Sequence, residues 1–210
     1  MTDVCMVIGA GAGIGGHVGK RFAAAGYHAA LCRRSDQQGL DNMVAEIEAS
    51  GGKASGHLLN AVDEGSIEKL IDDVEADIGP VNVLVYNLGA QIGNRSLADT
   101  PLKTFELGWR IGNLGVFRVA QKLFPKMVAR GGGALLVTSA TSAMRGNSGQ
   151  HSHAAAMGGR RMLCQTLNAE FASQNIHVAH ILIDSAVNAP DTLGKLLGPE
   201  RFAQLLEAKA

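Results

Sequence analysis

The sequence predicts an α/β protein built on one doubly wound parallel sheet, and three observations support this class. Short apolar runs alternate along the chain with longer stretches of helical periodicity. The 210 residues are 46% hydrophobic and 18% charged, which excludes a disordered chain and provides for a full core. Glycine occurs 27 times, so the backbone must approach other groups closely at several points. We expect a single domain over residues 1–210.

Six apolar runs bounded by glycine, asparagine or charged residues are expected as strands. They are Val4–Gly9, His28–Arg33, Ala54–Leu59, Val81–Asn87, Ala134–Ser139 and Ile176–Ile183. Because continuous apolar runs suit strands buried on both faces, these runs predict a parallel sheet covered by helices. Helical spacing is found in Gly15–Ala25, Asp36–Ala49, Glu64–Ile78, Thr104–Ala129 and Gly149–Ser173. The tail Asp191–Ala210 predicts one or two short helices.

Charge and cysteine content restrict the partners and the compartment. With 19 Lys and Arg against 19 Asp and Glu, the chain lacks the basic field that nucleic acid or an anionic membrane requires. Three cysteines in apolar runs, Cys5, Cys32 and Cys164, predict buried reduced thiols in a soluble cytoplasmic protein. No membrane span is expected, since the apolar N-terminal segment is short and rich in glycine. His151 and His153 have no cysteine or acidic residue at metal spacing, so no metal is expected.

A glycine-rich turn follows the first predicted strand. It consists of Gly9, Gly11, Gly13, Ile14 and Gly15, and a predicted helix follows directly. Glycines at such a turn let backbone N–H groups approach a pyrophosphate, and the positive end of the helix dipole attracts the phosphates. The alternative is a tight turn without a ligand. The position between the first strand and the first helix favours a dinucleotide site, so the sheet is expected to be of Rossmann type.

Two arginines, Arg33 and Arg34, stand at the end of the second predicted strand. A site for NAD(H) places an acidic residue there to bind the ribose hydroxyls. A guanidinium instead suits the 2′-phosphate of NADP(H), which it binds through two N–H groups. The alternative is a solvated basic strand end. The sequence therefore predicts NADP(H) over NAD(H).

From Val4 to about Pro190 the chain resembles the short-chain dehydrogenase/reductase family. Three segments carry the resemblance, namely Gly9, Gly13 and Gly15 in the pattern GxxxGxG, Asn60-Ala61 after the third strand, and Asn87-Leu88-Gly89 after the fourth. The resemblance implies that Asn60 and Ala61 contact adenine and that Asn87 and Gly89 also contact the cofactor. It further implies hydride transfer to or from a carbonyl or alcohol carbon of a small molecule.

The catalytic positions that the resemblance implies are all altered. The family uses a tyrosine, a lysine four residues later, a serine and an asparagine, and here these positions hold His153, Met157, Ala140 and Gly112, with Ser139 and Asn113 adjacent to the last two. An imidazole exchanges protons near neutral pH, so His153 is the candidate acid and Ser139 its companion. Met157 has neither the charge nor the donors of lysine.

Two functions from different classes stay open at this point. One is an NADP(H)-dependent oxidoreductase that acts on a carbonyl or alcohol through His153 and Ser139. The other is a non-catalytic dinucleotide-binding protein, such as a regulatory or partner subunit.

The resemblance also implies a homodimer through the long helices 104–129 and 149–173, with a monomer as the alternative. Because the family's last strand has no counterpart here, the tail is expected to cover the sheet edge at Ile176–Ile183.

Overall fold

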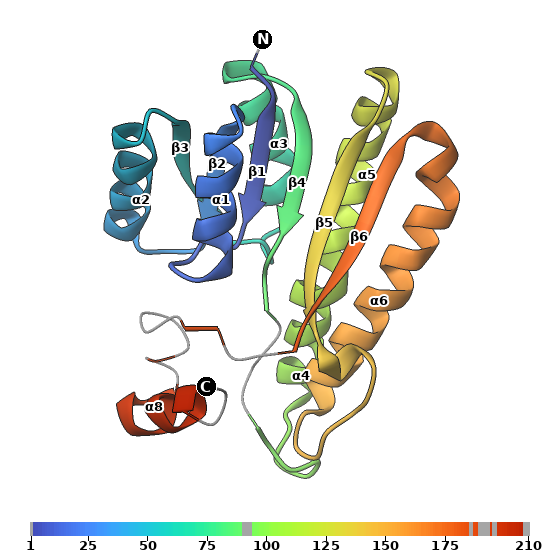
Figure 1. Ribbon diagram of the computed structural model, residues 1–210. Helices are drawn as coiled ribbons and strands as arrows, with labels where there is room; N and C mark the ends of the chain where they lie inside the picture. The colour runs from blue at the N-terminus through green and yellow to red at the C-terminus, as the bar shows by residue number, and fades with distance from the viewer. Residues whose placement is uncertain (1, 90–93, 185–186, 189–193, 195–196, 208–210) are drawn as a thin grey trace.

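Six parallel strands form one sheet in the order β3-β2-β1-β4-β5-β6 in the computed structural model of the chain (Figure 1). The structure describes residues 2–89, 94–184, 187–188, 194 and 197–207. The strands are β1 (Val4–Ile8), β2 (His28–Arg33), β3 (Lys53–Leu58), β4 (Val81–Tyr86), β5 (Gly133–Ala140) and β6 (Ile176–Ile183). All six predicted strands are confirmed within a residue or two, and so is the Rossmann-type sheet.

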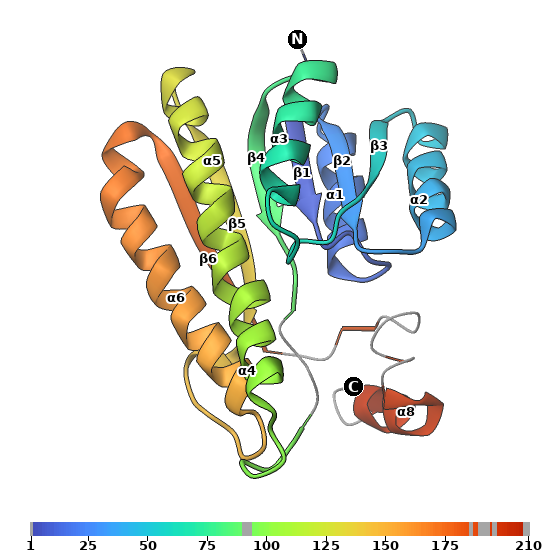
Figure 2. The ribbon, with the colours of Figure 1, turned by 180° about the vertical axis from the view of Figure 1, so that it is seen from behind.

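Helices cover the two faces of the sheet unequally. One face carries α1 (Ile14–Ala24) and α2 (Gln37–Ala49), which pack on β1, β2 and β4. The other carries α3 (Ser66–Asp77), α5 (Gly115–Ala129) and α6 (His151–Phe171) (Figure 2). Among the described residues, no helix covers β5 and β6 on the face that carries α1 and α2 (Figure 1). Both faces of the sheet are therefore buried over β1, β2 and β4, whereas no residue of the edge strand β3 is buried.

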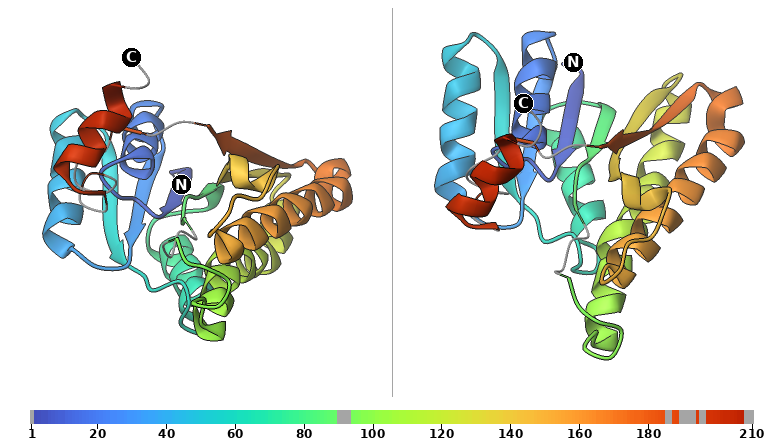
Figure 3. Two further views of the ribbon diagram at one scale, coloured as in Figure 1. Left: turned by 90° about the horizontal axis from the view of Figure 1, so that it is seen from below. Right: turned by 60° about the horizontal axis from the view of Figure 1, so that its bottom comes forward.

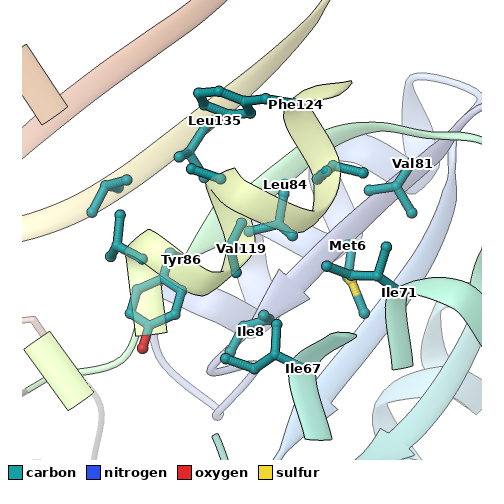
Figure 4. Packing of buried hydrophobic residues seen from close by; sticks show 14 of the residues in the cluster. Met6, Ile8, Ile67, Ile71, Val81, Leu84, Tyr86, Val119, Phe124 and Leu135 are labelled. Carbon is teal, nitrogen blue, oxygen red and sulfur yellow. The ribbon is translucent and has the colours of Figure 1, made fainter. Parts of the chain in front are cut away.

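The larger core lies between the sheet and α3, α5 and α6. Met6, Ile8 and Leu84 of the sheet meet Val119 and Phe124 of α5 in this core, all of them nearly inaccessible to solvent (Figure 4). Phe124 also contacts Phe171 of α6 edge to face, with ring centroids 5.0 Å apart. Apolar burial of this kind is the main favourable term in folding.

The predicted helix Thr104–Ala129 is interrupted by a π-helical turn. Helix α4 (Leu102–Trp109) passes through this turn (Arg110–Leu114) into α5, and a π turn holds one residue more than an α turn. The Tyr86 hydroxyl donates a hydrogen bond to the Ile111 carbonyl oxygen at 2.7 Å. A Cβ atom on Gly115 would overlap that hydroxyl. The helix thus widens where a buried tyrosine from β4 reaches it.

The described part of the tail does not cover β6. Helix α8 (Pro199–Glu207) lies on the side of the molecule that carries α1 and α2, away from β6 (Figures 1 and 3). Ile181 and Leu182 of β6 are 39% and 40% exposed. The prediction that the tail covers this edge is wrong for the described residues, and the rest of Asp191–Ala210 lies outside them. No helix in the described ranges is long and apolar enough to span a membrane.

Candidate functional site

A cavity of about 780 Å³ opens at the carboxyl ends of β1, β2, β3 and β4, the edge at which ligands bind in such sheets. All eleven residues predicted to bind the cofactor line it, namely Gly9, Gly11, Gly13, Ile14, Gly15, Arg33, Arg34, Asn60, Ala61, Asn87 and Gly89. Ser35, Asp36, Leu88, Leu107, Ile111 and Val187 line it as well. Its volume is in the range of small-molecule sites, so the predicted residues share one ligand-sized space.

The glycine turn presents the N-terminus of α1 to the cavity. Helix α1 has no side-chain cap at Gly13 and no acidic residue in its first turn. The N–H groups of Gly16 and His17 already donate to the Gly11 and Gly13 carbonyl oxygens, so α1 offers an anion the N–H groups of Ile14 and Gly15 and its positive dipole end. A Cβ atom on Gly15 would overlap the Gly9 carbonyl oxygen, and Gly9 has φ +97°. Glycine is thus required at both positions, and the turn fits a pyrophosphate.

Asn87 ties this turn to the neighbouring strand. Its Nδ2 donates to the Gly9 carbonyl oxygen at 3.0 Å, and its Oδ1 accepts from Thr138 Oγ1 at 2.8 Å. Asn87 lines the cavity, but both ends of its amide already bind the protein. The structure therefore gives Asn87 a role in fixing the turn, and its contact with a cofactor stays a prediction.

Two arginines hold the loop after β3 at the far end of the cavity. Arg118 of α5 donates to the Ala61 carbonyl oxygen at 2.9 Å and to that of Asp63 at 3.0 Å. Arg110 of the π turn donates to the Val62 carbonyl oxygen at 2.9 Å. Arg118 also binds both carboxylate oxygens of Glu68, and this hydrogen bonding lowers the pKa of Glu68. Three successive carbonyl groups are thus fixed from outside the loop.

The residues predicted at the catalytic positions lie close together, but they do not line the cavity. Ser139 and His153 are each 7% exposed and Met157 is 1% exposed. Ser139 Oγ donates to Met157 Sδ at 3.5 Å, and Ala140 packs against the apolar cluster of Ala156 and Met157. Ser139 and Met157 are therefore buried against each other instead of facing the cavity.

The polar groups of the π turn also bind other parts of the protein and do not face the cavity. The Gly112 carbonyl oxygen accepts from Arg160 Nε at 2.8 Å, and a Cβ atom on Gly112 would come within 2.7 Å of the Ala156 Cβ. Asn113 is 6% exposed, and its Nδ2 donates to the Ala156 carbonyl oxygen at 3.1 Å. The asparagine next to the predicted position thus faces α6, and neither residue lines the cavity.

Arg160 of α6 is the buried cation that the sequence reasoning missed. It is 1% exposed, and besides Gly112 it donates to the carbonyl oxygens of Thr138 at 2.7 Å and Leu88 at 2.9 Å. Its guanidinium lies 5.4 Å from the centre of the Tyr86 ring. Within the described residues it has no carboxylate partner, and burial lowers the pKa of Arg160. It binds the ends of β4 and β5 and the π turn to one helix.

Within the described ranges, no group of three or more His, Cys, Asp or Glu side chains is placed to hold a metal ion.

Residues 3–187 match the family described as short chain dehydrogenase. The chain belongs to that family. With it come the six-stranded Rossmann-type architecture and membership of a class of oxidoreductases.

Several relatives in this family have names or solved structures. The chain is 29% identical to a 2-dehydro-3-deoxy-D-gluconate 5-dehydrogenase of Formosa agariphila, over 83% of this chain and 66% of that protein. It is also 29% identical to the 3-oxoacyl-[acyl-carrier-protein] reductase FabG of Thermotoga maritima, over 83% and 70%. The chain therefore spans about two thirds of the length of these curated relatives.

A solved short-chain dehydrogenase of Rhodopseudomonas palustris is similar over nearly its whole length. It is 32% identical, with a TM-score of 0.83 over 96% of this chain and 93% of that chain. A 7α-hydroxysteroid dehydrogenase solved with NADH and a 7-oxo bile acid is 25% identical, with a TM-score of 0.82. The relatives named here for an activity are dehydrogenases or reductases.

Proposed function

We propose that this protein is an NADP(H)-binding member of the short-chain dehydrogenases, a single dinucleotide-binding domain over residues 1–210 that acts in the cytoplasm. The observation that carries the proposal is the cavity lined by the glycine turn, Arg33 and the Asn60 loop. The NADH in the related 7α-hydroxysteroid dehydrogenase supports the class of cofactor. When bound, a nicotinamide supplies a hydride. The chain would hold the pyrophosphate at the N-terminus of α1 and a ribose 2′-phosphate at Arg33.

Titration by calorimetry with NADPH and NADH tests this proposal. A charge-assisted contact of Arg33 with the 2′-phosphate is worth about 1.5–3 kcal/mol, which is roughly tenfold or more in affinity. We expect NADPH to bind more tightly than NADH and Arg33→Ala to remove most of that difference. Arg21→Ala, on the exposed end of α1, is the matched control and leaves both affinities unchanged. Equal affinities in the parent protein contradict the preference.

The geometry favours a protein with little or no turnover of its own. The six positions that carry or flank the family's reactive groups all lie outside the cavity lining, namely Gly112, Asn113, Ser139, Ala140, His153 and Met157. Positioned proton transfer contributes about 10²–10⁴-fold to such reactions. We therefore expect NADPH oxidation with a panel of small aldehydes and ketones to be absent or slow. Brisk turnover of any of them contradicts this part of the proposal.

A slow oxidoreductase that uses His153 is the second candidate. Ser139 Oγ and the side chain at the family's lysine position are already in contact at 3.5 Å, and His153 lies one turn earlier on the buried face of α6. A protonated imidazole at this place can donate its proton to a carbonyl oxygen, and Ser139 can orient that oxygen. Turnover that His153→Ala abolishes supports this candidate. Turnover that survives His153→Ala contradicts it.

We also propose that the protein forms a homodimer through α4, α5 and α6. Large apolar side chains are exposed on these helices, namely Phe105, Trp109, Phe117 and Met162 at 42%, 49%, 45% and 53%. Contiguous exposed apolar surface is typical of an interface. Light scattering at micromolar concentration should give the mass of a dimer, and Trp109→Glu should give that of a monomer. A tetramer contradicts the assignment of the interface.

A further inference from the structure

Asp36 lies beside Arg33 at the ribose end of the cavity, where the sequence pattern indicated arginines alone. Both residues line the large cavity and also a second hollow of about 490 Å³, which α1 and α2 enclose with His17, Lys20 and Glu46 among its lining. Arg33 and Asp36 are the two residues common to both spaces. Any ligand that reaches Arg33 from the cavity therefore also meets Asp36.

The Asp36 carboxylate is fixed by two contacts. Asp36 caps the N-terminus of α2 with φ +71°, and its Oδ1 accepts a hydrogen bond from the Gly39 N–H at 2.9 Å. Its Oδ2 lies 3.0 Å from Arg33 Nη2. A Cβ atom on Gly39 would overlap Asp36 Oδ2 and come within 2.7 Å of Arg33 Nη1. The carboxylate, the guanidinium and the first turn of α2 are thus packed together.

This pairing changes what Arg33 can offer to a ligand. The Arg33 side chain is 19% exposed, whereas that of Asp36 is 54% exposed, so a ligand approaching from solvent meets the carboxylate more readily. A 2′-phosphate carries close to two negative charges and must come near this carboxylate to bind Arg33, which costs like-charge repulsion. A ribose with a free 2′-hydroxyl meets no such repulsion and finds an acceptor for its O–H group.

We propose that Asp36 is a specificity-determining residue, which weakens the hold of Arg33 on a 2′-phosphate and accepts a ribose hydroxyl of NAD(H). The site consequently takes both cofactors, with a smaller preference for NADP(H) than Arg33 alone would give. This inference rests on the proposed binding of a dinucleotide in the cavity. It predicts that removing the charge of Asp36 sharpens the preference.

Asp36→Asn is the decisive variant because it removes only the charge. Asparagine is as good an N-cap as aspartate, and it tolerates a positive φ, so α2 keeps its start. Calorimetric titration should show the ratio of NADPH affinity to NADH affinity rising about tenfold. Asp41→Asn is the matched control, since Asp41 lies on the same helix, pairs with Gln37 and lines neither space. It should leave the ratio within about twofold of the parent value.

A second background separates the possible outcomes. In Arg33→Ala, the change from Asp36 to asparagine should still raise the ratio, because the carboxylate repels a 2′-phosphate and accepts a ribose hydroxyl without the guanidinium as well. A ratio that Asp36→Asn leaves unchanged while both cofactors bind overturns the inference and leaves dinucleotide binding intact. A parent protein that binds neither cofactor overturns the proposed function and this inference with it. A thermal melt of each variant shows whether α2 is intact.

Discussion

The two sides of the site use their polar groups in opposite ways. We call residues 4–65 the nucleotide side, with β1 to β3, α1 and α2, and residues 102–183 the catalytic side, with α4, α5, α6, β5 and β6. On the nucleotide side the uncapped end of α1, Arg33 and Asn60 line the open cavity. On the catalytic side Ser139, Asn113 and Arg160 are buried and bind other parts of the protein.

This difference separates polar groups that are open to a ligand from polar groups that the protein itself already satisfies. A polar group that protein partners already satisfy gains little from a ligand, whereas an unsatisfied N–H group at a helix end gains a hydrogen bond. The nucleotide side is therefore prepared for an anion. On the catalytic side the polar groups stabilise the fold instead, because each hydrogen bond of Arg160 joins a different segment to α6.

The largest effect is expected for Gly15→Ala, which breaks the nucleotide side alone. The added Cβ would overlap the Gly9 carbonyl oxygen, so α1 must move away from the glycine turn. We expect dinucleotide binding to be lost and the free energy of unfolding to fall by about 2–4 kcal/mol. Calorimetry and urea unfolding measure the two effects.

Gly158→Ala is the matched control for that variant. Gly158 lies within α6 and has no atom within 4 Å of an added Cβ. The substitution should stabilise the protein by up to about 1 kcal/mol, since alanine is the better helix former. Normal binding by Gly15→Ala would show that the cavity does not use this turn.

Placing the family's reactive groups on the catalytic side tests the proposal that this protein has little turnover of its own. Ala140→Ser, His153→Tyr and Met157→Lys place the serine, tyrosine and lysine that the family uses. Met157 and Arg160 lie one turn apart on the buried face of α6, so a lysine at 157 would repel the guanidinium. Turnover of a small ketone should therefore rise, but by less than the roughly 10²-fold that a well-placed proton donor gives. A rise of about 10²-fold or more with Arg160 in place would refute this repulsion.

Arg160 should contribute strongly to stability. Arg160→Met leaves the carbonyl groups of Leu88, Gly112 and Thr138 without their buried donor. Each unsatisfied group costs about 1–3 kcal/mol, so urea unfolding should show a loss of about 3 kcal/mol or more. Arg161→Met, one residue along the same helix on its less buried side, should change stability by less than about 0.5 kcal/mol. Similar losses for both variants would mean that the three bonds are unimportant.

The smallest effect is a pH dependence on the nucleotide side. Ser55 Oγ lies 2.9 Å from His28 Nε2 and 2.8 Å from His57 Nε2. A hydroxyl has one proton, so at most one of the two imidazoles can accept from Ser55, and the other must donate its Nε2 hydrogen to the oxygen. Burial lowers the pKa of both histidines. For His28, the nearby His57 and Lys53 lower the pKa further, and Glu48 raises it in part. For His57, the carboxylates of Asp73 and Asp77 raise the pKa in part.

Folded-state pKa values below the unfolded value of about 6.5 fix the sign of this dependence. Stability should be constant above that pH and should fall as the pH drops below it, because the unfolded chain then binds more protons. The decline ends below the folded-state values. Urea unfolding from pH 8 to pH 5 measures it, and the double variant His28→Gln, His57→Gln should flatten the curve. An unchanged slope in that variant would assign the dependence to other groups.

Much of the nucleotide side follows from local sequence. A strand that runs into Gly9 and Gly13 and then a helix fixes where the turn lies, and parallel strands bring Arg33, Asn60 and Asn87 to one edge. Asp36 was not found, because its left-handed backbone and its contact with Arg33 follow from the packing of Gly39 against both. The sequence therefore predicted which residues meet in the cavity, but it did not predict how their charges pair.

The catalytic side depends on contacts between distant segments, which local patterns do not record. The π turn arises where Tyr86 meets Gly115, and no periodicity predicts an extra residue in a helix. A signal for Arg160 was present, since a charged residue stands on the face of α6 that also carries Met157 and Cys164. What this arginine binds could be seen only once β4, β5 and the π turn were placed around it.

The three buried cysteines can report the order in which parts of the fold open. Burial raises the pKa of Cys5 to about 12 and that of Cys164 to about 11, and it also raises the pKa of Cys32. A thiol reagent attacks the thiolate, so each cysteine should remain inert until its surroundings open. Cys5 and Cys32 lie in β1 and β2, and Cys164 lies in α6. The order in which the three sites acquire a label during partial denaturation would therefore report whether β1 and β2 or α6 opens first.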